Sequence, residues 1–151
     1  MQTEICFKTS IGYAKISVEN NKIVKISFSE SGKNIDSDNS VLEKCKNQLL
    51  EYFEGKRKVF DCEIEMKGTE FQKKVWKELY KVPYGQTISY KQLAEKIGKP
   101  TAYRAVANAN RQNPVPVIYP CHRVIGSNGK LVGYAYGLDK KELLLKLEGV
   151  L

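Results

Sequence analysis

The alternation of apolar and polar residues near the N-terminus is the feature that most limits what this chain can fold into. Residues 4–8, 12–19 and 22–28 repeat with the two-residue period of half-buried β-strands. Asn20-Asn21 separates the last two segments, and asparagine pairs favour a tight hairpin turn. Strands joined by so short a turn are antiparallel. The pattern therefore predicts a small antiparallel sheet at the start of the chain.

A change of hydrophobic period after residue 40 predicts a helix. Apolar residues recur at helical spacing over 41–54, with Ser40 as the expected N-cap and Gly55 as the expected end. Residues 58–65 return to the alternation of a strand. We therefore predict an α/β domain over residues 1–67, a small antiparallel sheet plus a helix. It contains no histidine and no clustered polar motif, so a scaffold role is expected.

Helical spacing dominates the chain after the predicted linker 66–68. Helices are expected over four segments, 70–81, 90–97, about 101–110 and 139–148. Thr69, Ser89 and Asp139 are the expected N-caps of the first, second and fourth helices, and Ser89 begins a capping-box sequence. A short glycine-containing turn separates the second helix from the third, which is typical of a helix-turn-helix. Residues 68–151 are thus predicted to form a mainly helical domain with a helix-turn-helix.

The excess of basic residues lies in this second domain. Residues 1–67 contain as many acidic as basic side chains, so all of the formal net charge of +8 belongs to residues 68–151. A basic helical domain indicates a polyanionic partner, most simply nucleic acid, although an ordinary lysine-rich surface has the same composition. In a DNA-binding protein the third predicted helix would be the recognition helix, with Tyr103 and Arg104 near its N-terminal end.

The segment Pro120-Cys121-His122-Arg123 is the strongest candidate for chemistry. It places a thiol beside the only histidine of the chain and close to an arginine, and nearby cations lower the pKa of a thiol. This combination is typical of an activated cysteine nucleophile. A buried structural cysteine is the alternative that the pair alone leaves open.

The other cysteines and the hydropathy limit the setting in which the chain works. None of the four cysteines forms a Cys-x-x-Cys pair, and one histidine leaves few zinc ligands, so neither a metal nor a cofactor is expected. Pairing among Cys6, Cys45 and Cys62 stays open. No apolar run has the length of a transmembrane helix and no signal peptide is recognisable, so a cytoplasmic protein without a membrane partner is expected.

Residues 69–149 resemble one family, the O6-alkylguanine-DNA alkyltransferases, also called methylated-DNA–protein-cysteine methyltransferases. The matching pieces occur in the order and at the spacing of that family: Thr69-Glu70-Phe71-Gln72, Val75-Trp76, Val82-Pro83-Tyr84-Gly85, Ser89-Tyr90, Arg104-Ala105-Val106, Asn113-Pro114-Val115-Pro116, Pro120-Cys121-His122-Arg123-Val124, Gly133-Tyr134 and Glu148-Gly149. The resemblance implies a ribonuclease H-like N-terminal domain, and a monomer that binds the minor groove of double-stranded DNA.

The resemblance also implies a reaction. A guanine that carries an O6-alkyl group, or an O4-methylthymine, is flipped out of the duplex because its reacting atom cannot be reached inside the stack. The alkyl group then moves to Cys121, once for each protein molecule. His122 would act as the base through a water, Glu148 would orient His122, and Tyr90 would donate a hydrogen bond to the leaving base.

The same resemblance implies contacts with DNA and with the flipped base. Arg104 would enter the base stack and fill the gap that the flipped nucleotide leaves. The other residues implied at the DNA or at the base are Ala102, Tyr103, Asn113, Arg123, Val124, Tyr134 and Ala135. Asn113 would brace the turn ahead of Cys121, and backbone groups of Cys121, Val124 and Ala135 would hold the guanine edge.

Four positions depart from the pattern of the family. Tyr119 stands where an aliphatic residue is usual, and Ala135 stands where serine is frequent. Tyr136 takes a place that is often glycine, which predicts a narrower pocket mouth that disfavours bulky alkyl groups. Tyr103 is large for a helix face that must approach the minor groove closely.

Three other functions fit parts of this sequence. The first is a non-catalytic module that binds alkylated DNA and recruits other repair factors; such relatives lack the reactive cysteine, so Cys121 argues against it. The second is a DNA-binding regulator that uses the helix-turn-helix. The third is a cysteine hydrolase, for which the sequence shows no clear oxyanion hole.

Overall fold

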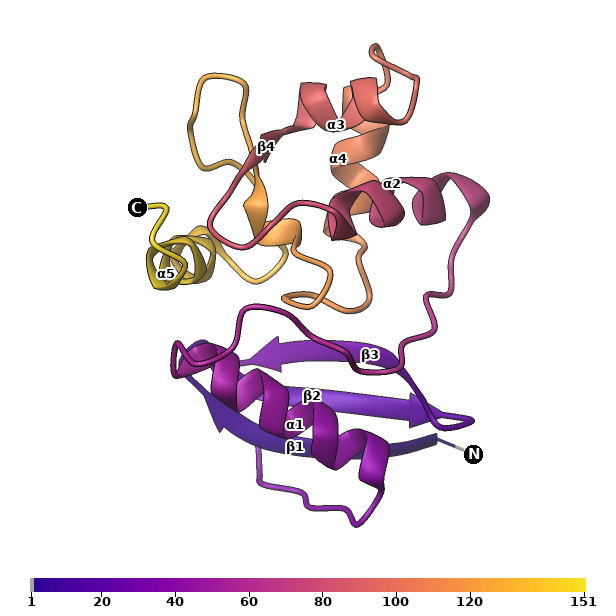
Figure 1. Cartoon of the computed structure of the whole chain (residues 1–151), viewed down its shortest axis with the longest axis vertical. Helices are drawn as coiled ribbons and strands as arrows, with labels where there is room; N and C mark the ends of the chain where they lie inside the picture. Colours follow the sequence, from indigo (N-terminus) through magenta and orange to yellow (C-terminus); the bar gives the residue numbers. More distant parts are fainter. Residues whose placement is uncertain (1) are drawn as a thin grey trace. The chain divides into compact units, whose positions relative to one another are not determined.

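The computed structural model in Figure 1 describes residues 2–151, which separate into two compact units that meet between Lys67 and Gly68 in the sequence. The first unit contains β1 (Gln2–Thr9), β2 (Gly12–Glu19), β3 (Lys22–Ser29) and α1 (Ser40–Phe53). The second contains α2 (Glu70–Tyr80), β4 (Ile88–Ser89), α3 (Tyr90–Lys96), α4 (Tyr103–Arg111), the 3-10 turn η1 (Cys121–Arg123), β5 (Val124–Ile125) and α5 (Leu138–Leu147). The predicted fold class is confirmed: a three-stranded antiparallel sheet with a helix, then a mostly helical part.

The sheet of the first unit has the strand order β1-β2-β3, with each strand antiparallel to the next. Asn20 and Asn21 form the predicted turn between β2 and β3, with φ of 50° and 60°. Asparagine tolerates this left-handed conformation, and two such residues in succession match the right-handed twist of a hairpin. A short turn of the right type therefore sets the register of these strands.

Helix α1 lies against the sheet (Figure 1), and most of its buried residues are apolar. Its N-cap is Asn39 and not the predicted Ser40: Oδ1 of Asn39 accepts the backbone N–H groups of Val41 and Leu42, each at 3.0 Å. Both residue types are good caps, and the one with its backbone outside the helix takes the role. Gly55 follows the helix with φ of 77°, as expected of a residue that ends one.

The strand predicted over residues 58–65 is not present. Only Ile64 forms a bridge to β3, where Ile23 donates to the Glu63 carbonyl at 2.8 Å and accepts from the Glu65 N–H at 2.9 Å. Further along the segment, the Gln48 side chain accepts the backbone N–H of residue 61 at 3.2 Å. The alternation of buried and exposed residues over 58–65 was predicted correctly. The backbone of residue 61, however, bonds to the Gln48 side chain of α1 and not to a neighbouring strand.

Helix α2 begins at the predicted N-cap Thr69, which also forms a capping box with Gln72 that was not predicted. Trp76 is buried on its inner face and donates its indole N–H to the Ala109 carbonyl of α4 at 2.8 Å. Gly68 packs against this ring so closely that a Cβ there would lie 2.6 Å from the Trp76 side chain. The linker position therefore requires a glycine.

Helices α3 and α4 pack together across a short turn and form the predicted helix-turn-helix. Ser89 and Gln92 form the predicted capping box at the start of α3, and Gly98 turns the chain with φ of 76°. Helix α5 begins one residue earlier than predicted, with Gly137 as its N-cap in place of Asp139. Gly137 has φ of 104°, so the chain direction changes there and Asp139 lies in the first turn.

Strands β4 and β5 form a two-stranded parallel pair that the sequence did not predict. Ile88 pairs with Val124, and Ser89 pairs with Ile125. This short pair connects the segment before α3 to the segment after η1 within the second unit.

No helix among residues 2–151 is long and apolar enough to cross a membrane.

Candidate active site

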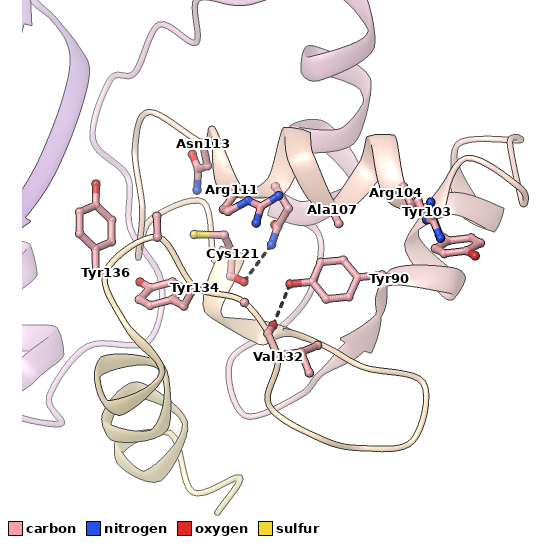
Figure 2. A pocket seen from close by; sticks show the side chains of 13 residues that line it. Tyr90, Tyr103, Arg104, Ala107, Arg111, Asn113, Cys121, Val132, Tyr134 and Tyr136 are labelled. Atoms are coloured by element: carbon pink, nitrogen blue, oxygen red, sulfur yellow. Dashed lines mark hydrogen bonds between the residues drawn. The ribbon is translucent and has the colours of Figure 1, made fainter.

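A cavity of about 240 Å³ opens in the second unit between α3, α4 and the loop that precedes α5. Its walls are Tyr90, Tyr103, Arg104, Ala107, Asn110, Arg111, Asn113, Cys121, Val132, Gly133, Tyr134, Ala135 and Tyr136. Figure 2 shows Cys121 near Tyr134 and Tyr136, while Tyr103 and Arg104 lie at the other end of the cavity. Most of the lining is therefore aromatic or small, with a few polar groups at defined places.

Cys121 is 5% exposed and lines this cavity. It begins η1, where its backbone N–H donates to the Tyr119 carbonyl at 2.8 Å. Burial raises the pKa of its thiol to about 11, against smaller opposing effects of Asn113, Lys141 and Tyr134. The thiol is therefore protonated at neutral pH, contrary to the expectation that adjacent cations would activate it.

The side chains of His122, Arg123 and Glu148 form a buried network behind the cysteine. The Nε2 atom of His122 lies 2.7 Å from Oε2 of Glu148. Arg123 donates from Nε to Oε1 of Glu148 at 2.8 Å and from Nη2 to Oε2 at 3.0 Å. The backbone N–H of Gly85 donates to Oε1 at 3.1 Å. One carboxylate at the end of α5 thus joins two residues of η1 to the backbone of Gly85.

His122 is completely buried and does not line the cavity itself. Burial lowers its pKa, although Glu148 acts in the opposite direction, so the ring is neutral near pH 7. With Glu148 accepting from the Nε2 proton, the other ring nitrogen is an acceptor. That atom, Nδ1, is buried and has no hydrogen-bond partner among the described residues.

Arg123 and Val124, which the resemblance implied at the DNA or at the base, lie outside the lining of the cavity. The guanidinium of Arg123 is buried against Glu148 and also donates to the Val82 carbonyl at 2.7 Å. The Val124 carbonyl accepts from the ammonium of Lys141. The guanidinium of Arg123 and the carbonyl of Val124 therefore have partners inside the unit. These partners come from α5 and its C-cap, which are distant in the sequence, so a local sequence pattern cannot reveal them.

Asn113 braces the turn ahead of Cys121, as the resemblance implied. Its Nδ2 donates to the Tyr119 carbonyl at 2.7 Å, and its Oδ1 accepts the Val115 N–H at 3.0 Å. Between these two anchors Val117 has φ of 73°, a left-handed conformation that is unfavourable for a β-branched residue. Such strain persists only where surrounding contacts enforce it. The turn that presents the thiol is thus held in place by Asn113.

Tyr90, Tyr134 and Ala135, which the resemblance implied at the flipped base, line the cavity. The Tyr90 hydroxyl donates to the Val132 carbonyl at 3.1 Å, which Figure 2 marks with a dashed line. Tyr136 also lines the cavity, and its ring packs edge-on against Tyr134 with 5.8 Å between the ring centres. The predicted narrowing at Tyr136 therefore has a structural basis, because two adjacent rings stand in this wall.

The N-terminal end of α4 forms the outer part of the site. Tyr103 and Arg104 line the cavity and are exposed, whereas Ala102 is the half-buried N-cap position and lies outside the lining. Arg104 forms no ion pair with an acidic residue of the described chain.

Three residues of the site were not identified from the sequence. Asn110 and Arg111 line the cavity from α4, and Lys141 lies behind it with no solvent exposure. The Lys141 ammonium donates to the carbonyls of Val124, Val132 and Gly133, the last two at 3.0 Å. The sequence does show the helical spacing that places Asn110 on the inner face of α4. An asparagine at that position, however, gives no signal that distinguishes it from an ordinary polar residue.

Within residues 2–151 no group of three or more histidine, cysteine or acidic side chains is arranged to hold a metal ion.

The second unit is basic, contains a helix-turn-helix and has a buried thiol in its pocket, and a small α/β unit precedes it. These features define a class of two-domain DNA-binding proteins with a cysteine in the pocket. Family models show which family this is. The model of the 6-O-methylguanine DNA methyltransferase DNA binding domain matches residues 70–150, and that of its ribonuclease-like domain matches residues 4–66. The chain belongs to the O6-methylguanine DNA methyltransferase family.

Two curated relatives share much of this sequence. A methylated-DNA–protein-cysteine methyltransferase of Methanosarcina acetivorans is 46% identical over 149 residues, which covers 95% of this chain and 96% of the relative. One of Methanosarcina barkeri is 61% identical over 101 residues. That match covers 67% of this chain and 64% of the relative's own length.

Solved structures agree with the fold of both units. The Mycobacterium tuberculosis O6-methylguanine methyltransferase superimposes with a TM-score of 0.88 at 38% identity, over 98% of this chain and 93% of that protein. A structure of M. tuberculosis OGT in complex with DNA also matches, with a TM-score of 0.88 at 39% identity over 95% of this chain and 90% of that one.

Proposed function

We propose that this chain is a methylated-DNA–protein-cysteine methyltransferase that repairs O6-methylguanine in DNA by accepting the methyl group on the sulfur of Cys121. A carbon–sulfur bond forms as the bond between the methyl carbon and guanine O6 breaks. The thiol proton goes to a base of the protein, and the guanine leaves as an anion that is then protonated. The stable thioether is not reversed, so each molecule acts once. The observation that carries this proposal is the Cys121 thiol in a cavity bordered by the helix-turn-helix.

His122 is proposed as the base, acting through one water. The thiol has a pKa of about 11, so it must lose its proton as the reaction proceeds. The buried Nδ1 of His122 is an acceptor on the side away from Glu148, and a bridging water there would connect it to the sulfur. Glu148 stabilises the imidazolium that forms and keeps the ring in the tautomer with a free Nδ1.

Tyr90 is proposed as the hydrogen-bond donor to the leaving guanine. Its hydroxyl lies at the cavity wall and has a carbonyl, Val132, as its present acceptor. A donor that turns from this carbonyl to the ring of the base stabilises negative charge as it builds there. Tyr134 and the backbone of Ala135 border the same space and are proposed to hold the edge of the base.

The proposed partner is double-stranded DNA, bound through its minor groove with the damaged base flipped out. The support is the exposed end of α4, where Tyr103 and Arg104 border the cavity. Arg104 is proposed to fill the space in the stack, with Ala102 close to the backbone of the DNA. The net charge of the second unit would make binding weaken as salt is added, because phosphate contacts release counterions.

The remaining proposals concern the whole chain. Residues 1–67 are proposed to be a scaffold and residues 68–151 the alkyltransferase domain, since every assigned role falls in the second range. One copy supplies all of these residues, which is in keeping with a monomer. The cysteines are free thiols, in keeping with a reducing cytoplasm. O4-methylthymine is proposed as a second substrate.

The decisive experiment mixes the protein with duplex DNA that contains O6-methylguanine and examines the Cys121 peptide by mass spectrometry. A methyl group on Cys121 with restored guanine is the expected result, and Cys121→Ala should bind the lesion without transfer. Tight binding with no transfer by the unmodified chain would support the alternative, a non-catalytic module that recruits other repair factors. No preference for the lesion over plain DNA would contradict both functions.

The role of Arg104 has its own test. Arg104→Ala should slow the repair of duplex DNA at least tenfold more than the reaction with the free base O6-methylguanine, since only the duplex requires flipping. Equal losses with the two substrates would show that Arg104 does not act in flipping.

A further inference from the structure

The guanidinium of Arg123 shares one carboxylate with the imidazole of His122. Arg123 is 6% exposed and donates from Nε to Oε1 of Glu148 at 2.8 Å and from Nη2 to Oε2 at 3.0 Å. The Nε2 atom of His122 lies 2.7 Å from the same Oε2. The remaining nitrogen of the guanidinium, Nη1, donates to the Val82 carbonyl at 2.7 Å. The carboxylate therefore has a permanent cation on one side and a titratable ring on the other.

The charges of these three buried groups balance only while the imidazole is neutral. Arginine stays protonated at every pH at which proteins fold, so Arg123 compensates the negative charge of Glu148. The side chains of His122 and Glu148 are both fully buried, where an unbalanced charge is strongly unfavourable. Burial lowers the pKa of His122, Glu148 raises it, and Arg123 and Lys141 lower it further. The guanidinium thus opposes protonation of the ring.

The other ionisable groups near this network do not take the place of Arg123. Cys121 and Tyr84 are neutral near pH 7, since burial raises the pKa of each above its ordinary value. The ammonium of Lys141 donates to three backbone carbonyls and not to Glu148. The cation in direct contact with the carboxylate is therefore Arg123.

We propose that Arg123 is a positioning residue of the methyl transfer: its charge keeps the pair of His122 and Glu148 free of an extra proton, so that the imidazole can accept the proton of the Cys121 thiol. This inference rests on the proposed function. Without the guanidinium, the buried pair would carry a net negative charge and would take up one proton to lose it. An imidazolium has no acceptor nitrogen, so the base would already be occupied.

NMR measures the charge of this ring directly, because His122 is the only histidine of the chain. Protein prepared without a histidine tag and labelled with 15N is titrated over the range in which histidine changes its charge, about pH 5 to 8. Arg123→Gln removes the charge and keeps N–H donors, whereas Arg123→Lys keeps the charge. The pKa of His122 should rise by about one unit or more in Arg123→Gln and should change much less in Arg123→Lys.

The pH dependence of single-turnover transfer from O6-methylguanine duplex DNA is the second readout. In Arg123→Gln the acid limb of the rate should move to higher pH by the interval found in the NMR titration. On that limb transfer should be about tenfold slower for each unit of the shift, and above it the rates should converge. A purely structural role of Arg123 would lower the rate by one factor at every pH.

Arg57→Gln is the matched control in the first unit. Arg57 also donates from Nε to a glutamate, Glu51 at 2.8 Å, and from Nη1 to a backbone carbonyl, that of Val59 at 2.9 Å. This pair is partly exposed and belongs to the unit that lacks His122. The control should leave the pKa of His122 and the acid limb unchanged. If Arg123→Gln is not folded in buffer, all proteins are titrated in trimethylamine N-oxide, which favours the compact state.

The outcomes separate this inference from the proposed function. An unchanged pKa of His122 in Arg123→Gln, or the same loss of rate at every pH, would overturn the inference. An imidazolium near pH 7 in the unmodified protein would overturn it as well. No methyl transfer by the unmodified protein would refute the proposed function, and the NMR titration would still decide the charge of the pair, because it requires neither DNA nor transfer.

Discussion

The change Glu148→Gln should both destabilise the second unit and disable its base. The carboxylate of Glu148 accepts from Gly85 N–H, from His122 and twice from Arg123, and its side chain is fully buried. The amide of glutamine retains one acceptor oxygen but turns a donor toward groups that are themselves donors. It also removes the negative charge beside a buried guanidinium.

The magnitude follows from the loss of that charge. Breaking a buried ion pair on one side costs about 3–5 kcal/mol, because the other charge stays buried without compensation. The free energy of unfolding of the second unit should therefore fall by about that amount. Transfer should slow by about 10² fold or more, the usual contribution of a positioned general base, because His122 loses the partner that stabilises its protonated form.

Glu142→Gln is the matched control on the same helix. Glu142 pairs with Lys146 at 3.1 Å four residues later, and both side chains are about half exposed. Such a pair contributes about 0.3–0.5 kcal/mol. The control should therefore unfold within about 0.5 kcal/mol of the unmodified protein and transfer the methyl group at the same rate.

Urea unfolding followed by tryptophan fluorescence measures the stability, since Trp76 is the only tryptophan and lies in the second unit. Single-turnover transfer is measured at a urea concentration where both variants are folded. The double change Glu148→Gln with Arg123→Met should recover part of the lost stability, because the buried charge is then also absent. If Glu148→Gln unfolds like Glu142→Gln, the network contributes no stability and this reasoning is wrong.

Four further results are expected. Alkylation of Cys121 by iodoacetamide, measured by mass spectrometry, should accelerate about tenfold for each pH unit up to about 11 while the protein is folded. A rate that reaches a plateau below about pH 9 would mean that burial does not keep the thiol protonated. Tyr136→Gly should raise the ratio of the transfer rate from O6-benzylguanine DNA to that from O6-methylguanine DNA about tenfold relative to the unmodified protein. An unchanged ratio would show that this ring does not limit alkyl size. Burial lowers the pKa of Lys141 from 10.5 to about 8, so between these two pH values the unfolded chain binds a proton that the folded chain has lost. The unfolding free energy of the unmodified protein should therefore rise between pH 8 and 10.5 relative to that of Lys141→Met. A fall of this difference over the same range would contradict the prediction. Asn39→Ala should lower the stability of the first unit by about 1 kcal/mol in urea unfolding, and no change would mean that this cap is replaced by water.

The parts of the fold that were predicted correctly depend on neighbours in the chain. The Asn20-Asn21 turn, the N-cap at Thr69 and the capping box at Ser89 are complete within a few residues, so a short pattern contains their geometry. The adjacency of Cys121 and His122 was visible for the same reason.

The errors arise where two nearby residues compete or where a distant residue decides. Asn39 and Gly137 took the cap positions expected of Ser40 and Asp139 because the path of the backbone chooses among adjacent residues. Arg123 was expected at the DNA, but a carboxylate that lies 25 positions further on holds it inside the unit.

By itself the sequence determined the hairpin sheet and the five helices, where the charge lies and which thiol stands beside the only histidine, since these properties depend on residue type and local spacing. Only the tertiary structure decided how the thiol is used. Burial keeps Cys121 protonated, Asn113 holds the strained turn before it, and Asn110 donates to its backbone carbonyl. These effects come from desolvation and from hydrogen bonds between residues separated in the chain, and both exist only once the helices have packed.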